Sequence, residues 1–240
     1  MGKLDFIYQR KSVRAFQPTP LPAEDLRQIL AAATQAPSGK NVQNWHFVVV
    51  RSRHKIVEIT KIVEAKNAKL AAFLTEEKAR SFRGLLPYYT VFRDAPVLVL
   101  AYGGPYPASD LQGCTEPQVM EAAKTSQLAR PGIQNVAAAM ENLLLAAAAL
   151  GYGGCWMTGP TFAAKEISAC LGFAKEDYQL LAVTPLGVPA TALGSPPRKA
   201  LVDNRPSRLA QNTLFTSRMA KLVNVTVTVK IRSHRRVRLL

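Results

Sequence analysis

The stretch from Gly132 to Leu150 restricts the possible folds more than any other part of this 240-residue chain. It is rich in alanine and leucine and apolar almost all round, and the glycines between Gly151 and Gly154 mark its end. A helix that is apolar on every side has to be covered, either inside a core or by another subunit. We therefore expect the rest of the chain to be built around this helix.

The remaining periodic segments predict a mixture of helices and strands. Pro22 is followed by Glu24 and Asp25, and acidic residues favour the first turn of a helix. The continuous apolar run from Ala95 to Leu100 is typical of a strand buried on both faces. Helices are expected over 4–10, from residue 23 to about 36, 56–78, 132–150 and 165–171, and strands over 45–50, 95–100 and 178–186. This mixture predicts an α/β or α+β fold.

Composition excludes several classes of protein. No apolar stretch approaches the ~20 residues that a membrane helix needs, and the first ten residues lack the apolar core of a secretion signal. The three cysteines, Cys114, Cys155 and Cys170, show no C-x-x-C spacing, which argues against a disulfide framework and a structural zinc site. We expect a cytoplasmic protein with no membrane association and no metal.

The C-terminal part of the chain has a different charge from the rest. Nine of the 31 basic residues lie between Arg205 and Leu240, where there is no acidic residue. Residues 222–231 alternate as one strand would, and four arginines follow. We assign 1–203 to one domain and 204–240 to a basic extension. The extension could bind nucleic acid or an anionic surface by charge alone, but a flexible solvated tail is the favoured interpretation, and translated sequence without a function is a third.

Three polar segments could hold a ligand. If residues 10–14 are extended, Arg10, Ser12 and Arg14 lie on one side and make a phosphate clamp, although a solvated basic turn fits the spacing better. The loop over 36–45 offers hydroxyl and amide groups. The glycine-rich run over 151–160 lets backbone approach a flat ligand, but it follows a helix and is no dinucleotide fingerprint.

Taken in order, these segments resemble the nitroreductase family. The resemblance rests on QRKSVRAF at 9–16, APSGKNVQNW at 36–45, RDAPVLVL at 93–100, GYGGCWMTGP at 151–160, PLGVP at 185–189 and PPRK at 196–199. It covers about residues 4–203. It implies an α+β fold with a central mixed or antiparallel sheet flanked by helices, an intertwined homodimer, and one FMN at each end of the dimer interface.

The resemblance also implies roles for single residues. Arg10, Lys11 and Ser12 match the phosphate side of the flavin site, with Arg198 as a further phosphate ligand. Arg14 matches the cation near the ribityl chain and the N1/O2 edge. The partner-chain loop corresponds to Pro37, Ser38, Gly39 and Asn41, and the segment facing the ring corresponds to Met157, Thr158 and Gly159. The family often has proline where this chain has Asn44, and Asn67 is a candidate for a further flavin contact.

The resemblance implies an FMN-dependent oxidoreductase. NADH or NADPH would pass hydride to flavin N5, and a small-molecule acceptor such as a nitroaromatic or quinone would then be reduced; no side-chain nucleophile is required. Ene reduction, dehalogenation or flavin breakdown on the same fold are alternatives. Acceptor choice is expected to depend on residues 76–127, although at least half of their aromatic side chains are expected to be core or interface: Phe82, Tyr88, Tyr89, Phe92, Tyr102 and Tyr106.

Overall fold

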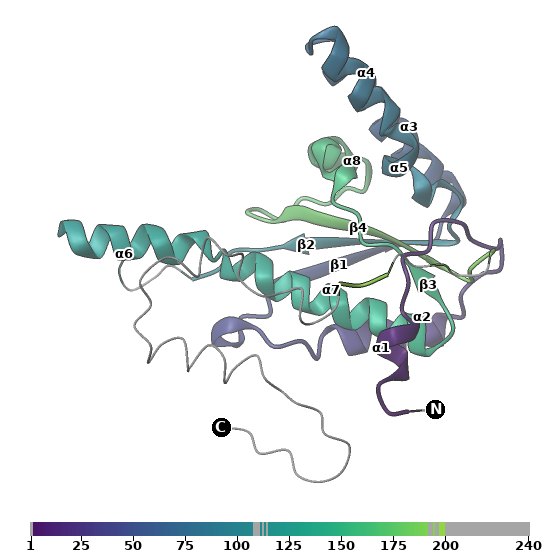
Figure 1. Cartoon of the computed structure of the whole chain (residues 1–240), viewed down its shortest axis with the longest axis horizontal. Coiled ribbons are helices and arrows are strands. Elements are labelled where there is room, and N and C mark those ends of the chain that lie inside the picture. The colour runs from purple at the N-terminus through teal and green to yellow at the C-terminus, as the bar shows by residue number, and fades with distance from the viewer. Residues whose placement is uncertain are drawn as a thin grey trace. The chain divides into compact units, whose positions relative to one another are not determined.

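A four-stranded sheet with the order β1-β2-β4-β3 forms the centre of the computed structural model (Figure 1). The strands are β1 (Trp45–Val50), β2 (Val97–Gly103), β3 (Gly153–Gly154) and β4 (Gln179–Gly187), and all neighbours are antiparallel. Trp45 pairs with Gly103 at one end of the sheet, and Gly154 pairs with Leu186 at the other. With the helices on both sides, this is the α+β fold that the resemblance implied.

Helices cover both faces of the sheet. In β2, Val97, Val99 and Ala101 face α2 (Ala23–Ala33) and α7 (Pro131–Ala149), whereas Leu98, Leu100 and Tyr102 face α3 (Arg53–Ala71) and α8 (Ala164–Cys170). Every residue of β2 is buried, as expected for a strand with a covered face on each side. Two apolar cores therefore share one strand.

The structure describes residues 2–107, 111, 113, 115–191, 194 and 197–199. The chain divides into two units, 1–195 and 196–240, and only 197–199 of the second are described. The predicted extension over 204–240, with its strand over 222–231, lies outside the described residues, as does the boundary at residue 203. Those assignments remain predictions.

The helix predicted over 56–78 is in fact two helices. α3 ends at Ala71, and α4 (Glu76–Gly84) begins after Thr75 with Glu76 and Glu77 in its first turn. Acidic residues favour a helix start, so the chain restarts there and does not continue. α5 (Leu86–Tyr89) and α6 (Pro117–Leu128) lie in the stretch for which no element was predicted. α1 (Asp5–Gln9) matches the short helix expected at the N-terminus.

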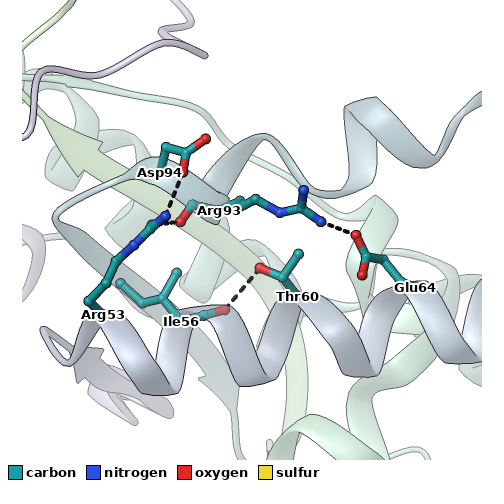
Figure 2. A network of polar contacts seen from close by, with 6 residues as sticks. All are labelled: Arg53, Ile56, Thr60, Glu64, Arg93 and Asp94. Carbon is teal, nitrogen blue, oxygen red and sulfur yellow. Dashed lines mark hydrogen bonds and ion pairs between the residues drawn. The ribbon is translucent and has the colours of Figure 1, made fainter.

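A polar network fixes the segment before β2 to α3, as Figure 2 shows. Arg53 on α3 donates to Asp94 at 2.6 Å and also to the carbonyl of Arg93. Arg93 in turn forms an ion pair with Glu64, one turn beyond Thr60. Phe92, which immediately precedes these anchors in the chain, is fully buried. The RDAPVLVL motif is thus a structural anchor that sets where β2 enters the core.

Several helices leave apolar side chains exposed in the single chain. α6 extends away from the sheet (Figure 1), and Met120 and Leu128 on it are exposed. Ile133 on α7 and Ile7 on α1 are exposed as well. Within one chain these apolar side chains are therefore left uncovered. Within the described residues, no helix combines the length and hydropathy needed to span a membrane.

Candidate functional site

The N-terminal basic segment lies against the glycine turn that follows α7. Ser12 forms a parallel bridge with Gly154, and the Val13 amide donates to the Gly154 carbonyl at 2.9 Å. Val13 is buried, whereas Ser12 and Arg14 are exposed. The extended alternation predicted from the sequence is therefore present, and it turns the hydroxyl and the guanidinium to the same side.

The positive charges of Arg10 and Arg14 both act on the Cys155 thiol. Burial raises the pKa of the Cys155 thiol, while the guanidinium groups of Arg14 and Arg10 oppose that rise. Both arginines are thus close enough to act on one buried sulfur atom. Arg10 follows the end of α1 and lies 3.8 Å from a carboxylate oxygen of Glu141 on α7. Glu141 could not be predicted from the sequence, because it comes near Arg10 only through the packing of α1 against α7.

The glycine-rich run over 151–160 is packed too tightly for a side chain at Gly153 or at Gly159. A Cβ atom on Gly153 would lie 2.7 Å from Val13 Cβ, and one on Gly159 would lie 2.6 Å from Tyr89 Cε1. Such distances force a displacement. The absence of a side chain at these two glycines therefore lets Val13 and Tyr89 pack directly against the backbone.

Three residues, Met157, Thr158 and Gly159, are predicted to face the ring, and they differ in how far their groups are already used within the protein. The Met157 amide donates to the Val183 carbonyl at 3.0 Å, and the Met157 side chain is buried in the core. Thr158 is exposed and Gly159 half-buried. A donor to a bound ring from this segment would have to come from Thr158 or Gly159, because the Met157 amide is already committed to the sheet.

The Pro37–Asn41 loop lies at the other end of the sheet. It precedes Trp45, which pairs with Gly103, and Gly103 pairs with Gln179 on β4. The basic segment instead adjoins Gly154, which pairs with Leu186. At ~3.4 Å per residue, Gln179 and Leu186 on β4 are about 24 Å apart. The structure therefore brings Arg10, Ser12, Arg14 and the glycine turn together, but not the loop of the same chain.

The remaining predicted site residues differ in burial and in the part of the chain to which they belong. Lys11 is half-buried within the basic segment, and Arg198 is exposed but belongs to the second unit, so its phosphate role stays a prediction. Asn67 is buried and donates to the Phe82 carbonyl at 3.2 Å, which ties α3 to α4. Of the aromatic side chains considered, Phe92 and Tyr102 are core residues, as expected for part of that set.

Tyr89 is the aromatic residue that the structure places at the site. Its ring covers Gly159, and it packs edge-on against Phe162 with ring centroids 5.4 Å apart. A separate hollow of about 520 Å³ lies beside Phe16, Arg51 and Pro96. None of the predicted site residues lines that hollow.

Comparison with known proteins agrees with this geometry. A sequence model of the Nitroreductase family matches residues 7–188. The chain belongs to the nitroreductase family. The match begins within α1 and ends just after β4, so it contains every later helix and strand described above.

Solved structures of relatives share this nitroreductase fold. A BluB-like flavoprotein from Clostridium difficile 630 has a TM-score of 0.78 and 36% identity, over 86% of this chain and 98% of its own. A nitroreductase with bound FMN from Bacteroides fragilis has a TM-score of 0.64 and 26% identity, over 83% of this chain and 96% of its own. Among sequences, a protein of Archaeoglobus fulgidus whose name contains "NADH dehydrogenase/NAD(P)H nitroreductase" is 29% identical over 64% of this chain and 66% of its own length. This chain is accordingly an oxidoreductase of the nitroreductase family.

Proposed function

We propose that this nitroreductase binds FMN with the Arg10–Arg14 segment and the turn from Gly153 to Gly159, and reduces nitroaromatic, quinone or similar acceptors with NADH or NADPH. The observation that carries the proposal is the Ser12–Gly154 bridge, which joins a basic strand to a glycine turn. The cationic side chains of Arg10 and Lys11 and the Ser12 hydroxyl suit a phosphate dianion, and Arg14 is left for the ring edge. The residues present therefore fit the phosphate and ring of FMN.

The protein's own part is to bind, orient and stabilise charge. Arg10, Lys11 and Ser12, with Arg198, would hold the phosphate, and Arg14 would hold negative charge near the N1/O2 edge. Thr158 and Gly159 would present backbone to the ring. Bound FMN supplies the hydride chemistry, which agrees with Cys155 being a buried thiol with a raised pKa.

We further propose that the working form is a homodimer in which the loop of Pro37, Ser38, Gly39 and Asn41 completes the partner's site. The loop and the basic segment lie at different ends of one sheet. The exposed apolar residues of α1, α6 and α7 supply surface for association. Light scattering after gel filtration should give about twice the 26.2 kDa chain mass.

The cofactor part of the proposal is tested by the purified protein itself. The wild type should absorb near ~450 nm as a flavoprotein does, bind FMN added to the apoprotein, and be bleached anaerobically by NADH or NADPH. Arg14→Ala should bind FMN at least about tenfold more weakly, because one charge-assisted contact is worth roughly 1.5–3 kcal/mol. Arg27→Ala is the matched control, since Arg27 is an exposed arginine paired with Glu24 on α2. A wild-type protein that takes up no FMN would refute the proposal.

The acceptor and the limits of the domain need separate assays. Turnover with nitroaromatics, quinones, enoates and halogenated aromatics, each with both nicotinamides, distinguishes reduction from the other flavin reactions of this fold. A chain ending at residue 203 should keep flavin and turnover if 204–240 is an extension. Loss of both would show that the extension is part of the enzyme.

A further inference from the structure

Two buried asparagines meet below the Pro37–Asn41 loop. Asn44 and Asn135 are 5% and 6% exposed, and Asn135 Nδ2 donates to Asn44 Oδ1 at 2.9 Å. One follows the loop and the other lies on α7, 91 residues further along the chain. Buried amides are costly unless they are hydrogen-bonded, so this pair needs an explanation.

Each polar side-chain atom of the pair has a partner. Asn44 Nδ2 donates to the carbonyls of Gly104, at 2.9 Å, and Gly132, at 3.2 Å. Asn135 Oδ1 accepts from the Gly39 amide at 3.0 Å. The pair therefore joins the loop to the end of β2 and to the first turn of α7. A buried network that is fully satisfied favours one arrangement of the chain.

The loop cannot hold its shape by local preference. Lys40, Asn41 and Gln43 have φ values of 53°, 53° and 45°, in the left-handed region that L-residues seldom adopt. Within the loop, Ser38 Oγ accepts from the Gln43 amide at 3.1 Å, and Asn41 Oδ1 accepts from Gln43 Nε2 at 3.0 Å. These bonds orient Ser38 and Asn41 relative to each other. Among the side-chain hydrogen bonds of the described residues, only the one from the Gly39 amide to Asn135 fixes the Pro37–Asn41 loop to α7.

Two glycines beside the pair are closely packed, and Asn44 also borders a hollow of about 270 Å³. A Cβ atom on Gly39 would lie 2.5 Å from the Tyr106 hydroxyl, and one on Gly132 would lie 3.2 Å from Asn44 Nδ2. A change in either amide is therefore transmitted to the loop, because close-packed groups cannot absorb the displacement.

We propose that Asn44 and Asn135 are positioning residues that hold the Pro37–Asn41 loop in the geometry it needs at the flavin site. The proposal rests on the role for that loop proposed above. Asn44 stands where the family often has proline, which offers no side-chain amide and could not make these contacts. The pair touches no reacting atom and acts through Gly39.

The test compares three alanine variants of the full chain, two single and one double, with a fourth variant as control. Asn44→Ala and Asn135→Ala should each weaken FMN binding by about tenfold or more and change the visible circular dichroism of bound flavin, because displacements near 1 Å at a binding site are costly. The double variant should be little worse than either single one, since the network acts as a unit. Asn142→Ala is the matched control: Asn142 is also on α7 and donates to the Ala32 carbonyl at 3.3 Å, away from the loop. It should lower the melting temperature and leave FMN affinity and the flavin spectrum unchanged.

The outcomes separate this proposal from the proposed function. Wild-type protein that binds no FMN refutes the function, whereas wild-type binding with all three variants behaving like Asn142→Ala refutes the clamp. If the Asn44 and Asn135 variants do not fold, hydrogen exchange of the wild type decides. The Gly39 amide should be protected, and exchange as fast as an exposed loop amide overturns the proposal.

Discussion

Gly153→Ala tests whether the contact between the basic segment and the glycine turn builds the flavin site. The new Cβ atom would lie 2.7 Å from Val13 Cβ, where ordinary contacts begin at 3.4 Å, so the two segments must separate by at least 0.7 Å. The Val13–Gly154 hydrogen bond, now 2.9 Å, would stretch beyond normal range.

The expected cost follows from these two effects. Overpacking costs roughly 1–3 kcal/mol, and the lost hydrogen bond about 1 kcal/mol. The free energy of unfolding should therefore fall by about 2–4 kcal/mol, which lowers the melting temperature by roughly 5–15 °C in a chain of this size. Ser12 and Arg14 flank Val13, so FMN affinity of the folded protein should fall about tenfold as well.

The assay is thermal unfolding of the apoprotein, followed by FMN titration below the transition. Gly84→Ala is the control, because a Cβ on Gly84 in α4 meets no atom within 4 Å, and this change should be neutral or slightly stabilising. A Cβ atom on Gly153 would also clash with both γ-methyl groups of Val13. Val13→Ala combined with Gly153→Ala should therefore be less harmful than the sum of the single changes, since these clashes are gone and only the Cβ–Cβ contact remains. Wild-type stability and FMN affinity in Gly153→Ala, or strict additivity in the double variant, would refute the reasoning.

Three further outcomes are expected from side chains outside the flavin contacts. Thr184 Oγ1 is buried and has no hydrogen-bond partner among the described residues, so Thr184→Val should raise the free energy of unfolding by about 1 kcal/mol in urea titrations. The Thr60 hydroxyl donates to the Ile56 carbonyl, so Thr60→Val should not raise it. A gain in both variants would contradict this account. Burial, and then the charge of Lys175, lower the pKa of His46, so the unfolded chain binds the proton more readily and stability should fall as pH drops below ~6.5. His46→Gln should flatten the difference in urea midpoint between pH ~7.5 and ~5.5, and an unchanged difference would exclude His46 as its source. Cys155, with its raised thiol pKa, should react slowly with iodoacetamide in the native protein and fast after denaturation, as read by peptide mass spectrometry; rapid native labelling would argue against its burial.

The sequence predicted the elements whose pattern is strong and local. The apolar run that became β2 and the helix that became α7 are both present, because continuous burial leaves a clear signal. α6 was not predicted: its side chains are mostly exposed in one chain, and only Ala123 is buried, so no apolar face marked it. β3 consists of two glycines, and glycine predicts turns far more often than strands.

The candidate site was predictable only as separate pieces. Alternation in the basic segment indicated that Ser12 and Arg14 share a side, and the structure agrees. That Ser12 would pair with Gly154 depends on packing between segments far apart in sequence. The same holds for Arg10 near Glu141 and for Asn44 bonded to Asn135. Tertiary partners of this kind leave no trace in local spacing.

The separation of the two site segments along the sheet has a genetic consequence. In the proposed dimer each site takes its basic segment from one chain and its loop from the other. A chain altered at Arg14 therefore supplies a damaged basic segment, and a chain altered at Asn41 supplies a damaged loop. When both are expressed together, about half of the dimers are mixed, and in each of these one site has only intact residues. Two inactive alleles would then restore about a quarter of the sites, whereas two alleles altered in the same half would restore none. Co-expression thus provides a measure of which residues of this protein serve their own chain and which serve its partner.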